Sequence, residues 1–145
     1  MSVELPFAPV DTVIRRQAGG LRVSADAAEE LARRIQVRGA ALAAEAAEEA
    51  TDDGRKTLMA ADFGVDSVPD KDALELPVAP IDRVARIDID GDYRVAMDAR
   101  IALAAMLERF ADDVAAAAAD LARHADRRTI KAEDVEAYFE LEQYY

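Results

Sequence analysis

The sequence predicts an all-α fold that consists of two tandem copies of a short–long–short helical unit. Residues 4–9 (ELPFAP) recur 71 positions later as residues 75–80 (ELPVAP), which indicates an internal repeat. Apolar residues in the second half recur at steps of three and four, which is the period of one face of a helix. We therefore expect two units, over residues 1–70 and 73–145.

The repeat continues along most of the chain after one inserted residue. Arg22-Val23 recurs 72 positions later as Arg94-Val95, and this offset then holds. The junction falls at residues 67–72 (SVPDKD), a polar stretch whose proline stops a helix. The same offset relates these further pairs: Leu31 and Leu103, Arg55 and Arg127, Ala60 and Ala132, Asp62 and Asp134.

The second unit carries the clearest signals for its elements. Pro80 fits near the start of a short helix, because proline's missing N–H is not needed there. Residues 90–92 (DGD) end that helix, and a long helix is expected over residues 97–125. An extended link at residues 127–130 leads to a last helix that begins near Ala132. The long helix is expected to present these apolar residues on one face: Leu103, Leu107, Phe110, Val114, Ala118 and Leu121.

The first unit repeats this plan with a weaker end. Ser24 is expected to cap its long helix, since a serine oxygen can accept a hydrogen bond from a free N–H at a helix start. Its last helix should be short, because Gly64 and Pro69 bracket only a few residues. A unit with one long helix has no closed core, so we expect the long helices of the two units to cross within one chain.

The charge balance is acidic and poor in lysine. The chain has 30 acidic and 18 basic residues, a net charge of -12, and lysine only at positions 56, 71 and 131. Taken alone, this charge argues against nucleic-acid and membrane partners. Such a surface suits a cytoplasm at molar salt; an ordinary acidic protein is the alternative. We find no secretory signal and no membrane-length apolar stretch, and therefore expect a soluble, intracellular protein.

Nothing in the sequence favours an enzyme. Cysteine is absent and His124 is the only histidine, so neither a histidine triad nor a thiolate or multi-histidine metal site can be built. A glycine-rich phosphate loop is also missing. We expect no cofactor, no metal and no small-molecule substrate.

Three stretches resemble the archaeal histone family: residues 75–83 (ELPVAPIDR), 98–101 (DARI) and 121–134 (LARHADRRTIKAED). With the acidic surface, the chain resembles the fused, doublet histones of halophilic archaea. The resemblance implies two histone folds that clasp each other as an intrachain handshake pseudo-dimer, with loops paired as short parallel strands. It also implies binding of curved double-stranded DNA along one basic edge.

The resemblance implies DNA contacts from the first helices and the loops. Contacts of this kind are mostly to phosphate, whereas loop arginines would lie at the minor groove. Arg15 and Arg86 have the alternative of being ordinary solvated helix residues, and Thr12 replaces the counterpart of Arg83. The candidate DNA-binding residues are Arg15, Arg22, Lys56, Thr57, Arg83, Arg86, Arg94, Arg128 and Thr129.

Two further basic residues are expected to brace the loops. By the resemblance, Arg55 pairs with Asp62 and Arg127 pairs with Asp134, each seven residues apart. Direct contact of these two arginines with DNA is the alternative.

The resemblance also implies a contact between chains at one end. Leu121, His124 and Asp134 match the face that joins histone dimers, whereas Glu49 and Asp52 occupy the places of Leu121 and His124 in the first unit. Carboxylates there would be costly to bury against a like surface. We therefore expect two chains to meet through the second unit. The alternative for the first-unit end is a plain surface or a different partner.

The leading hypothesis for function is a DNA-binding architectural protein of the nucleoid with little sequence preference. The alternative is a regulatory or protein-interaction module that kept the histone fold and binds DNA weakly or at selected sites. DNA affinity falls steeply with salt, which keeps this second hypothesis open.

Overall fold

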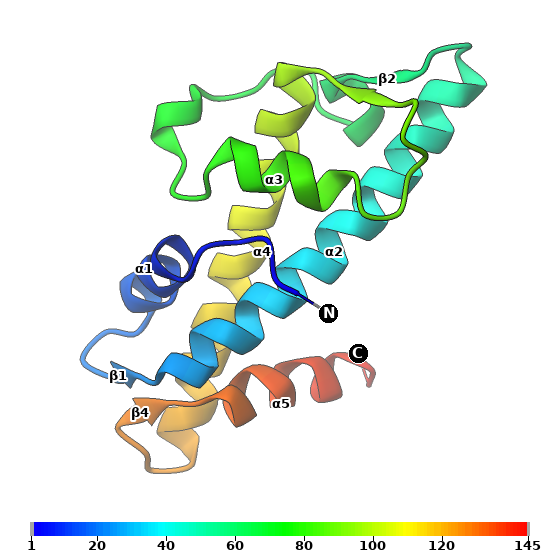
Figure 1. Cartoon of the computed structure of the whole chain (residues 1–145). Coiled ribbons are helices and arrows are strands. Elements are labelled where there is room, and N and C mark those ends of the chain that lie inside the picture. The colour runs from blue at the N-terminus through cyan, green and yellow to red at the C-terminus, as the bar shows by residue number, and fades with distance from the viewer. Residues whose placement is uncertain (1, 145) are drawn as a thin grey trace.

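The computed structural model describes residues 2–144 and shows two helical units that clasp each other (Figure 1). The predicted all-α fold of two short–long–short units is confirmed. In chain order the elements are α1 (Phe7–Gln17), β1 (Arg22–Val23), α2 (Ala25–Asp52), β2 (Thr57–Leu58), η1 (Ala60–Phe63), η2 (Lys71–Ala73), α3 (Val78–Ala85), β3 (Arg94–Val95), α4 (Met97–His124), β4 (Thr129–Ile130) and α5 (Ala132–Glu142).

The two units are joined by their long helices and by their loops. Helices α2 and α4 have 28 residues each and cross in the middle of the molecule (Figure 1). Strand β1 of the first unit pairs in parallel with β4 of the second, and β2 pairs in parallel with β3. Each loop pair therefore contains one strand from each unit, as the resemblance implies.

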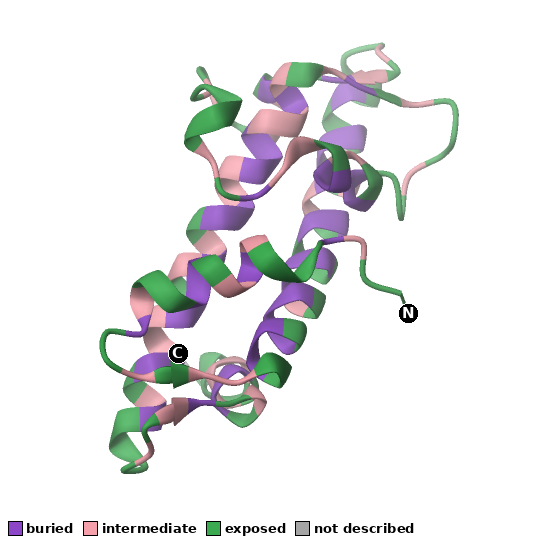
Figure 2. Cartoon of the chain, turned by 60° about the vertical axis from the view of Figure 1, so that its left-hand side comes forward, coloured by how far each residue is buried: buried purple, intermediate pink, exposed green. Residues whose placement is uncertain are grey.

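The core lies along the inner faces of the crossed helices, which are buried in Figure 2. Alanine fills much of this core, and small side chains let the helices approach closely. Gly39 marks one close approach: an added Cβ would lie 2.7 Å from Cγ1 of Val84 and 2.9 Å from Cδ1 of Leu107. Gly39 of the first unit thus packs directly against Val84 and Leu107 of the second unit, and a side chain at position 39 would not fit.

The predicted apolar face of α4 is only partly buried. Leu103, Leu107, Val114 and Ala118 are fully buried, but Phe110 and Leu121 are half-exposed. Phe110 packs at the surface against the ring of Phe139, with 6.0 Å between ring centroids. Leu121 lines an apolar groove near the C-terminal end of α4.

The long helices begin differently in the two units. Ser24 caps α2 as predicted: its Oγ accepts a hydrogen bond from the N–H of Ala27 at 3.3 Å. The same Oγ donates to the carbonyl of Ile130 at 3.0 Å and so also links the units. The corresponding N-cap of α4 is Ala96, which has an extended backbone but no side chain that could cap the helix.

The chain segment before each unit's first helix is held by the long helix of the same unit. Glu108 Oε1 accepts hydrogen bonds from the N–H groups of Glu75 and Leu76 at 2.6 and 3.0 Å. The counterpart of Glu108 in the first unit is Gln36, whose Oε1 accepts from the N–H of Glu4 at 2.7 Å. Both side chains are almost fully buried, so these bonds fix the position of each first helix.

The first unit ends in a short 3-10 helix, η1, in place of a full last helix. Gly64 ends η1 with a positive φ of 81°, a backbone conformation that favours glycine. No helix within residues 2–144 is long and apolar enough to cross a membrane.

Candidate nucleic-acid interface

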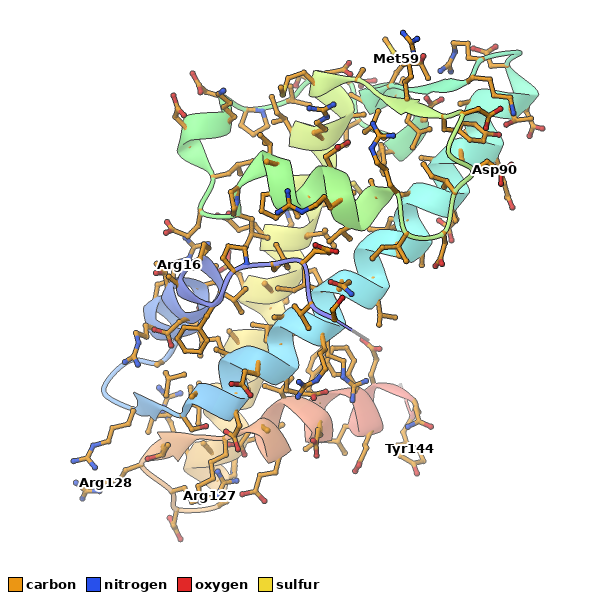
Figure 3. All side chains as sticks on the ribbon, in the orientation of Figure 1. Arg16, Met59, Asp90, Arg127, Arg128 and Tyr144 are labelled. Carbon is orange, nitrogen blue, oxygen red and sulfur yellow. The ribbon has the colours of Figure 1, made fainter. Side chains whose placement is uncertain are left out.

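The β1–β4 loop pair brings two predicted DNA-binding arginines together. The N–H of Arg22 donates to the carbonyl of Arg128 at 2.8 Å, and Arg22 lies opposite Thr129 in the strand register. Arg22 and Arg128 are exposed, and Figure 3 shows Arg128 extending from this end into solvent. Each arginine comes from a different unit, so this pairing depends on the clasp.

The β2–β3 loop pair repeats this geometry at the other end. The N–H of Arg94 donates to the carbonyl of Lys56 at 2.8 Å, and Thr57 lies opposite Arg94 in the register. Thr57 and Thr129 are half-buried and Arg94 is exposed. The two loop pairs thus place their predicted DNA-binding residues at equivalent positions.

Arg55 braces the first unit's loop from inside. Its guanidinium donates to both carboxylate oxygens of Asp62, at 2.7 and 2.9 Å, and to the carbonyl of Thr57 at 2.8 Å. Asp62 also accepts from the N–H of Met59 at 2.7 Å, and its side chain is 4% exposed. The hydrogen bonds from Arg55 hold the pKa of Asp62 below its usual value, and Asp62 in turn raises the pKa of Arg55.

Arg127 braces the second unit's loop in the same way. It donates to both oxygens of Asp134 at 2.5 and 2.7 Å, and this bond raises the pKa of Arg127. Asp134 also accepts from the N–H of Lys131 at 2.8 Å, and its side chain is 2% exposed. Arg127 therefore has most of its hydrogen-bonding capacity committed within the loop.

Four of the other predicted DNA-binding residues already have carboxylate partners. Arg15 in α1 lies 2.7 Å from Asp11, and Arg86, the C-cap residue of α3, lies 3.1 Å from Asp82. The remaining two pairs are Arg83 with Glu4 at 3.3 Å and Lys56 with Asp92 at 3.4 Å. Each of these cations would have to exchange or share its partner to bind a phosphate.

Arg22, Arg94 and Arg128 differ from that group. No carboxylate of residues 2–144 lies within 4.0 Å of their charged nitrogens, and all three are exposed. They are the predicted contacts whose positive charge is not compensated by a close partner, and they occupy both loop pairs.

The two loop pairs have different electrostatic surroundings. The residues before Arg22 are uncharged (AGGL, 18–21), whereas those before Arg94 are acidic (DIDGDY, 88–93). Tyr93 belongs to this acidic segment, and the Lys56 ammonium lies 4.4 Å from the centre of its ring. The β1–β4 pair therefore carries the stronger uncompensated positive charge.

The two ends also differ in the surfaces proposed for contacts between chains. Near the end of α4, an apolar groove of about 410 Å³ is lined by Leu121, Tyr138 and Leu141, among others. His124 is exposed close by. Asp134 points inward to Arg127 and offers no free carboxylate oxygen within the described chain.

At the opposite end, the surface is acidic. A shallow hollow of about 270 Å³ is lined by Glu49, Asp52, Asp53, Arg55 and Asp62.

Comparison with known families identifies this architecture. Residues 3–64 and 74–137 each match the model for "Histone-like transcription factor (CBF/NF-Y) and archaeal histone". The chain belongs to this family. The two matched segments correspond to the two clasped units, so both are histone folds.

Single-unit archaeal histones and a solved histone structure are similar to this chain. One of the subunits of the archaeal histone HAN1 from Thermococcus zilligii is 54% identical over 61 residues, which cover 42% of this chain and 88% of that protein. "Probable archaeal histone 3" of Methanocaldococcus jannaschii is 44% identical over 63 residues, covering 43% and 91%. The crystal structure of the histone from Methanopyrus kandleri matches 91% of both chains with a TM-score of 0.64 and 23% identity, which shows the fold.

Some residues of this histone interface were missed by sequence reasoning. Lys131 directly follows β4, is exposed, and has no carboxylate of residues 2–144 within 4.0 Å. Its position beside the candidate residues 128 and 129 was the available signal. Arg16 was also unassigned: it bonds Glu108 at 2.9 Å and Asp112 at 3.1 Å on α4, and both bonds raise its pKa.

Proposed function

We propose that this histone-fold protein binds and bends double-stranded DNA with little sequence preference, as an architectural protein of the nucleoid in the cytoplasm. The observation that carries the proposal is the exposure of Arg22, Arg94 and Arg128 at two loop pairs, without close carboxylate partners. A 28-residue helix is about 42 Å long, so the loop pairs at opposite ends of α2 have a separation comparable to one turn of B-DNA, about 34 Å. Contacts about one turn apart favour bending, because the DNA between them has to follow the protein surface.

The chemistry of these contacts supports shape and phosphate recognition over base recognition. Arginine side chains from loops can enter a narrow minor groove, where sequence information is poor. Thr57 and Thr129 lie opposite Arg94 and Arg22 in the strand registers, and their hydroxyls would add hydrogen bonds to phosphate beside these arginines. Arg15, Arg83, Arg86 and Lys56 would add secondary contacts after exchange of their partners.

The net charge of -12 fits this proposal if the protein works as a doublet histone of a halophilic archaeon. Each phosphate neutralised lowers the log of affinity by about 0.9 per decade of salt, so three contacts lose about 500-fold and six lose about 10⁵-fold. Binding in molar salt then requires high abundance or selected sites. A low cellular abundance would favour the alternative of a regulatory module.

We further propose that two chains meet through the second histone fold, with residues 73–145 as its extent. The apolar groove beside Leu121 supports this contact, and the acidic hollow at the opposite end disfavours a second one. Sedimentation equilibrium should give a dimer that Leu121→Glu abolishes, because a carboxylate would be buried unpaired. A monomer in the wild type, or longer oligomers, would contradict this arrangement.

Binding of a short labelled duplex across a series of KCl concentrations tests the proposal. Arg22→Ala combined with Arg94→Ala should weaken binding at every concentration, whereas Lys71→Ala should not, since Lys71 lies in η2 outside both loop pairs. Energy transfer between dyes at the duplex ends should rise on binding if the DNA bends. Unchanged affinity in the double variant would overturn the assignment of the DNA edge.

A further inference from the structure

The two loop pairs, which are related by the 72-residue offset, carry different net charges. Residues 18–24 and 125–131, which contain the β1–β4 pair, hold four cations and one aspartate, a net charge of +3. The corresponding residues 90–96 and 53–59, which contain the β2–β3 pair, hold three cations and three aspartates, a net charge of zero. The fold places these two sets at opposite ends of the long helices (Figure 1).

Individual positions show how this difference arises. Arg128 and Lys131 are exposed and have no carboxylate of residues 2–144 within 4.0 Å. Their counterparts are Lys56, which lies 3.4 Å from Asp92, and Met59, which has no charge. Figure 3 shows Met59 at the end of the molecule opposite Arg128. The β2–β3 pair therefore has one cation fewer, and another of its cations is neutralised by a close carboxylate.

The ends of the long helices enlarge the difference. Arg123, near the end of α4, donates to the carbonyl of Ala18 at 3.1 Å, which brings its guanidinium to the loop before β1. Its carboxylate partner Asp120 is 71% exposed, so this ion pair is weak. The counterpart of Arg123 is the uncharged Thr51. Beside Thr51, a hollow of about 380 Å³ has these acidic residues in its lining: Glu48, Asp52, Asp88 and Asp90.

This asymmetry matters when the two DNA segments that meet the loop pairs differ in shape. An A-tract has a narrow minor groove with a more negative potential than that of a G·C-rich segment. A loop pair with a net charge of +3 gains more from this potential than a neutral pair does. The orientation that puts the β1–β4 pair over the narrow groove therefore has the lower free energy.

We propose that the chain binds DNA with a defined polarity, in which the β1–β4 loop pair occupies the narrower of two successive minor grooves and the β2–β3 pair occupies the wider one. This inference rests on the proposed function, because both loop pairs have to contact one duplex. The polarity follows groove width and not base identity, so it is compatible with little sequence preference. Since the two orientations differ in electrostatic energy, the preference should shrink as salt screens the charges.

Directed DNA cleavage measures this polarity, because the chain has no cysteine and a single introduced one can carry an iron–EDTA label. Gly20→Cys labels the loop before β1 and Gly91→Cys labels the loop before β3; an added Cβ at either position meets no atom within 4 Å. The duplex has an A-tract and a G·C-rich segment about 10 base pairs apart.

The measured quantity is the ratio of cleavage beside the A-tract to cleavage beside the G·C-rich segment. At about 0.1 M KCl, this ratio should be at least about threefold higher for the Gly20→Cys label than for the Gly91→Cys label. Comparing two labels on one duplex cancels any difference in how easily the two segments are cut.

Three substitutions that equalise the loop pairs should remove the polarity. Lys131→Met, Asp90→Asn and Asp92→Asn together leave a net charge of +2 at each pair, so the two labels should give the same ratio. The matched control has the same total charge but changes exposed residues outside both loop pairs, and it should keep the polarity. Its substitutions are Lys71→Met, Asp113→Asn and Glu140→Gln.

The possible failures are distinguishable. Equal ratios for the two labels in the otherwise unchanged chain would overturn the polarity and leave DNA binding intact. A polarity that persists in the equalised variant would overturn the proposal by showing that charge is not its cause. Cleavage by neither label would contradict the proposed function as well, because neither loop pair would then lie at the DNA.

Discussion

The N–H of Arg22 donates a hydrogen bond to the carbonyl of Arg128 at 2.8 Å, across a strand pair formed by the two units. This bond joins two exposed arginines on backbone segments that are far apart in sequence. Neither unit could present both charges alone. The tandem arrangement therefore supplies the site as well as the core.

The acidic setting of the β2–β3 loop pair predicts that one charge removal tightens DNA binding. Asp92→Asn frees Lys56, whose ammonium lies 3.4 Å from the Asp92 carboxylate, and it removes a charge that repels phosphate. We expect affinity for duplex DNA to rise about two- to fivefold at about 0.1 M KCl, and the gain to shrink at higher salt. Anisotropy titrations measure this gain. An equal gain with Asp113→Asn, at an exposed position of α4 without a close cationic partner among residues 2–144, would show a general charge effect instead.

The two N-caps predict opposite effects of exchanging serine and alanine. Ser24→Ala should lower the free energy of unfolding by about 1 kcal/mol, since the N–H of Ala27 loses its acceptor. Ala96→Ser should raise it by about 0.5–1 kcal/mol, because Ala96 has the extended backbone of an N-cap without a capping side chain. Urea denaturation of both variants measures these changes. A destabilising Ala96→Ser would contradict the equivalence of the two helix starts.

The close approach at Gly39 predicts that side chains are not tolerated there. Gly39→Leu should cost about 1–3 kcal/mol or more through overpacking against Val84 and Leu107, despite the better helix propensity of leucine. Gly20→Leu is a useful comparison, because an added Cβ at Gly20 meets no atom within 4 Å. Thermal unfolding should show a much larger drop in Tm for the first variant than for the second.

The Arg55–Asp62 pair predicts a loss of stability in acid. The folded-state pKa of Asp62 is lowered below its unfolded value of about 3.9, chiefly by the hydrogen bonds from Arg55. The pair therefore contributes its full stability above about pH 4 to 5 and loses it as the pH falls through the folded pKa. Urea midpoints measured from pH 7 to pH 2 should fall steeply at the acid end. The decline should be shallower in Asp62→Asn, which starts from a lower midpoint at pH 7.

Sequence patterns predicted the fold well because the repeat is direct and the helical periodicity is local. The start of α4 at Met97 and the cap at Ser24 depend on neighbouring residues alone. Phe110 and Leu121 are less buried than the other apolar residues of this face. The period of a helix shows which residues share a face, but it does not show how far another element covers that face. Here the extent of the covered surface depends on where α5 ends, which is a tertiary property.

The candidate site was harder to predict because charge compensation depends on residues distant in the sequence. Arg83 is paired with Glu4, 79 positions away, and Arg16 with Glu108, 92 positions away. The residues next to Arg16 and Arg83 in the sequence do not reveal these distant partners. The structure thus divides the candidate residues into compensated and uncompensated cations.

The most direct test of the account is the dependence of DNA affinity on salt when the three uncompensated arginines are removed together. In a plot of log affinity against log KCl concentration, the slope for Arg22→Ala/Arg94→Ala/Arg128→Ala should be shallower than the wild-type slope by about 2–3, close to 0.9 per lost phosphate contact. A parallel line, with the wild-type slope retained, would show that DNA binds elsewhere on the molecule and would contradict the account.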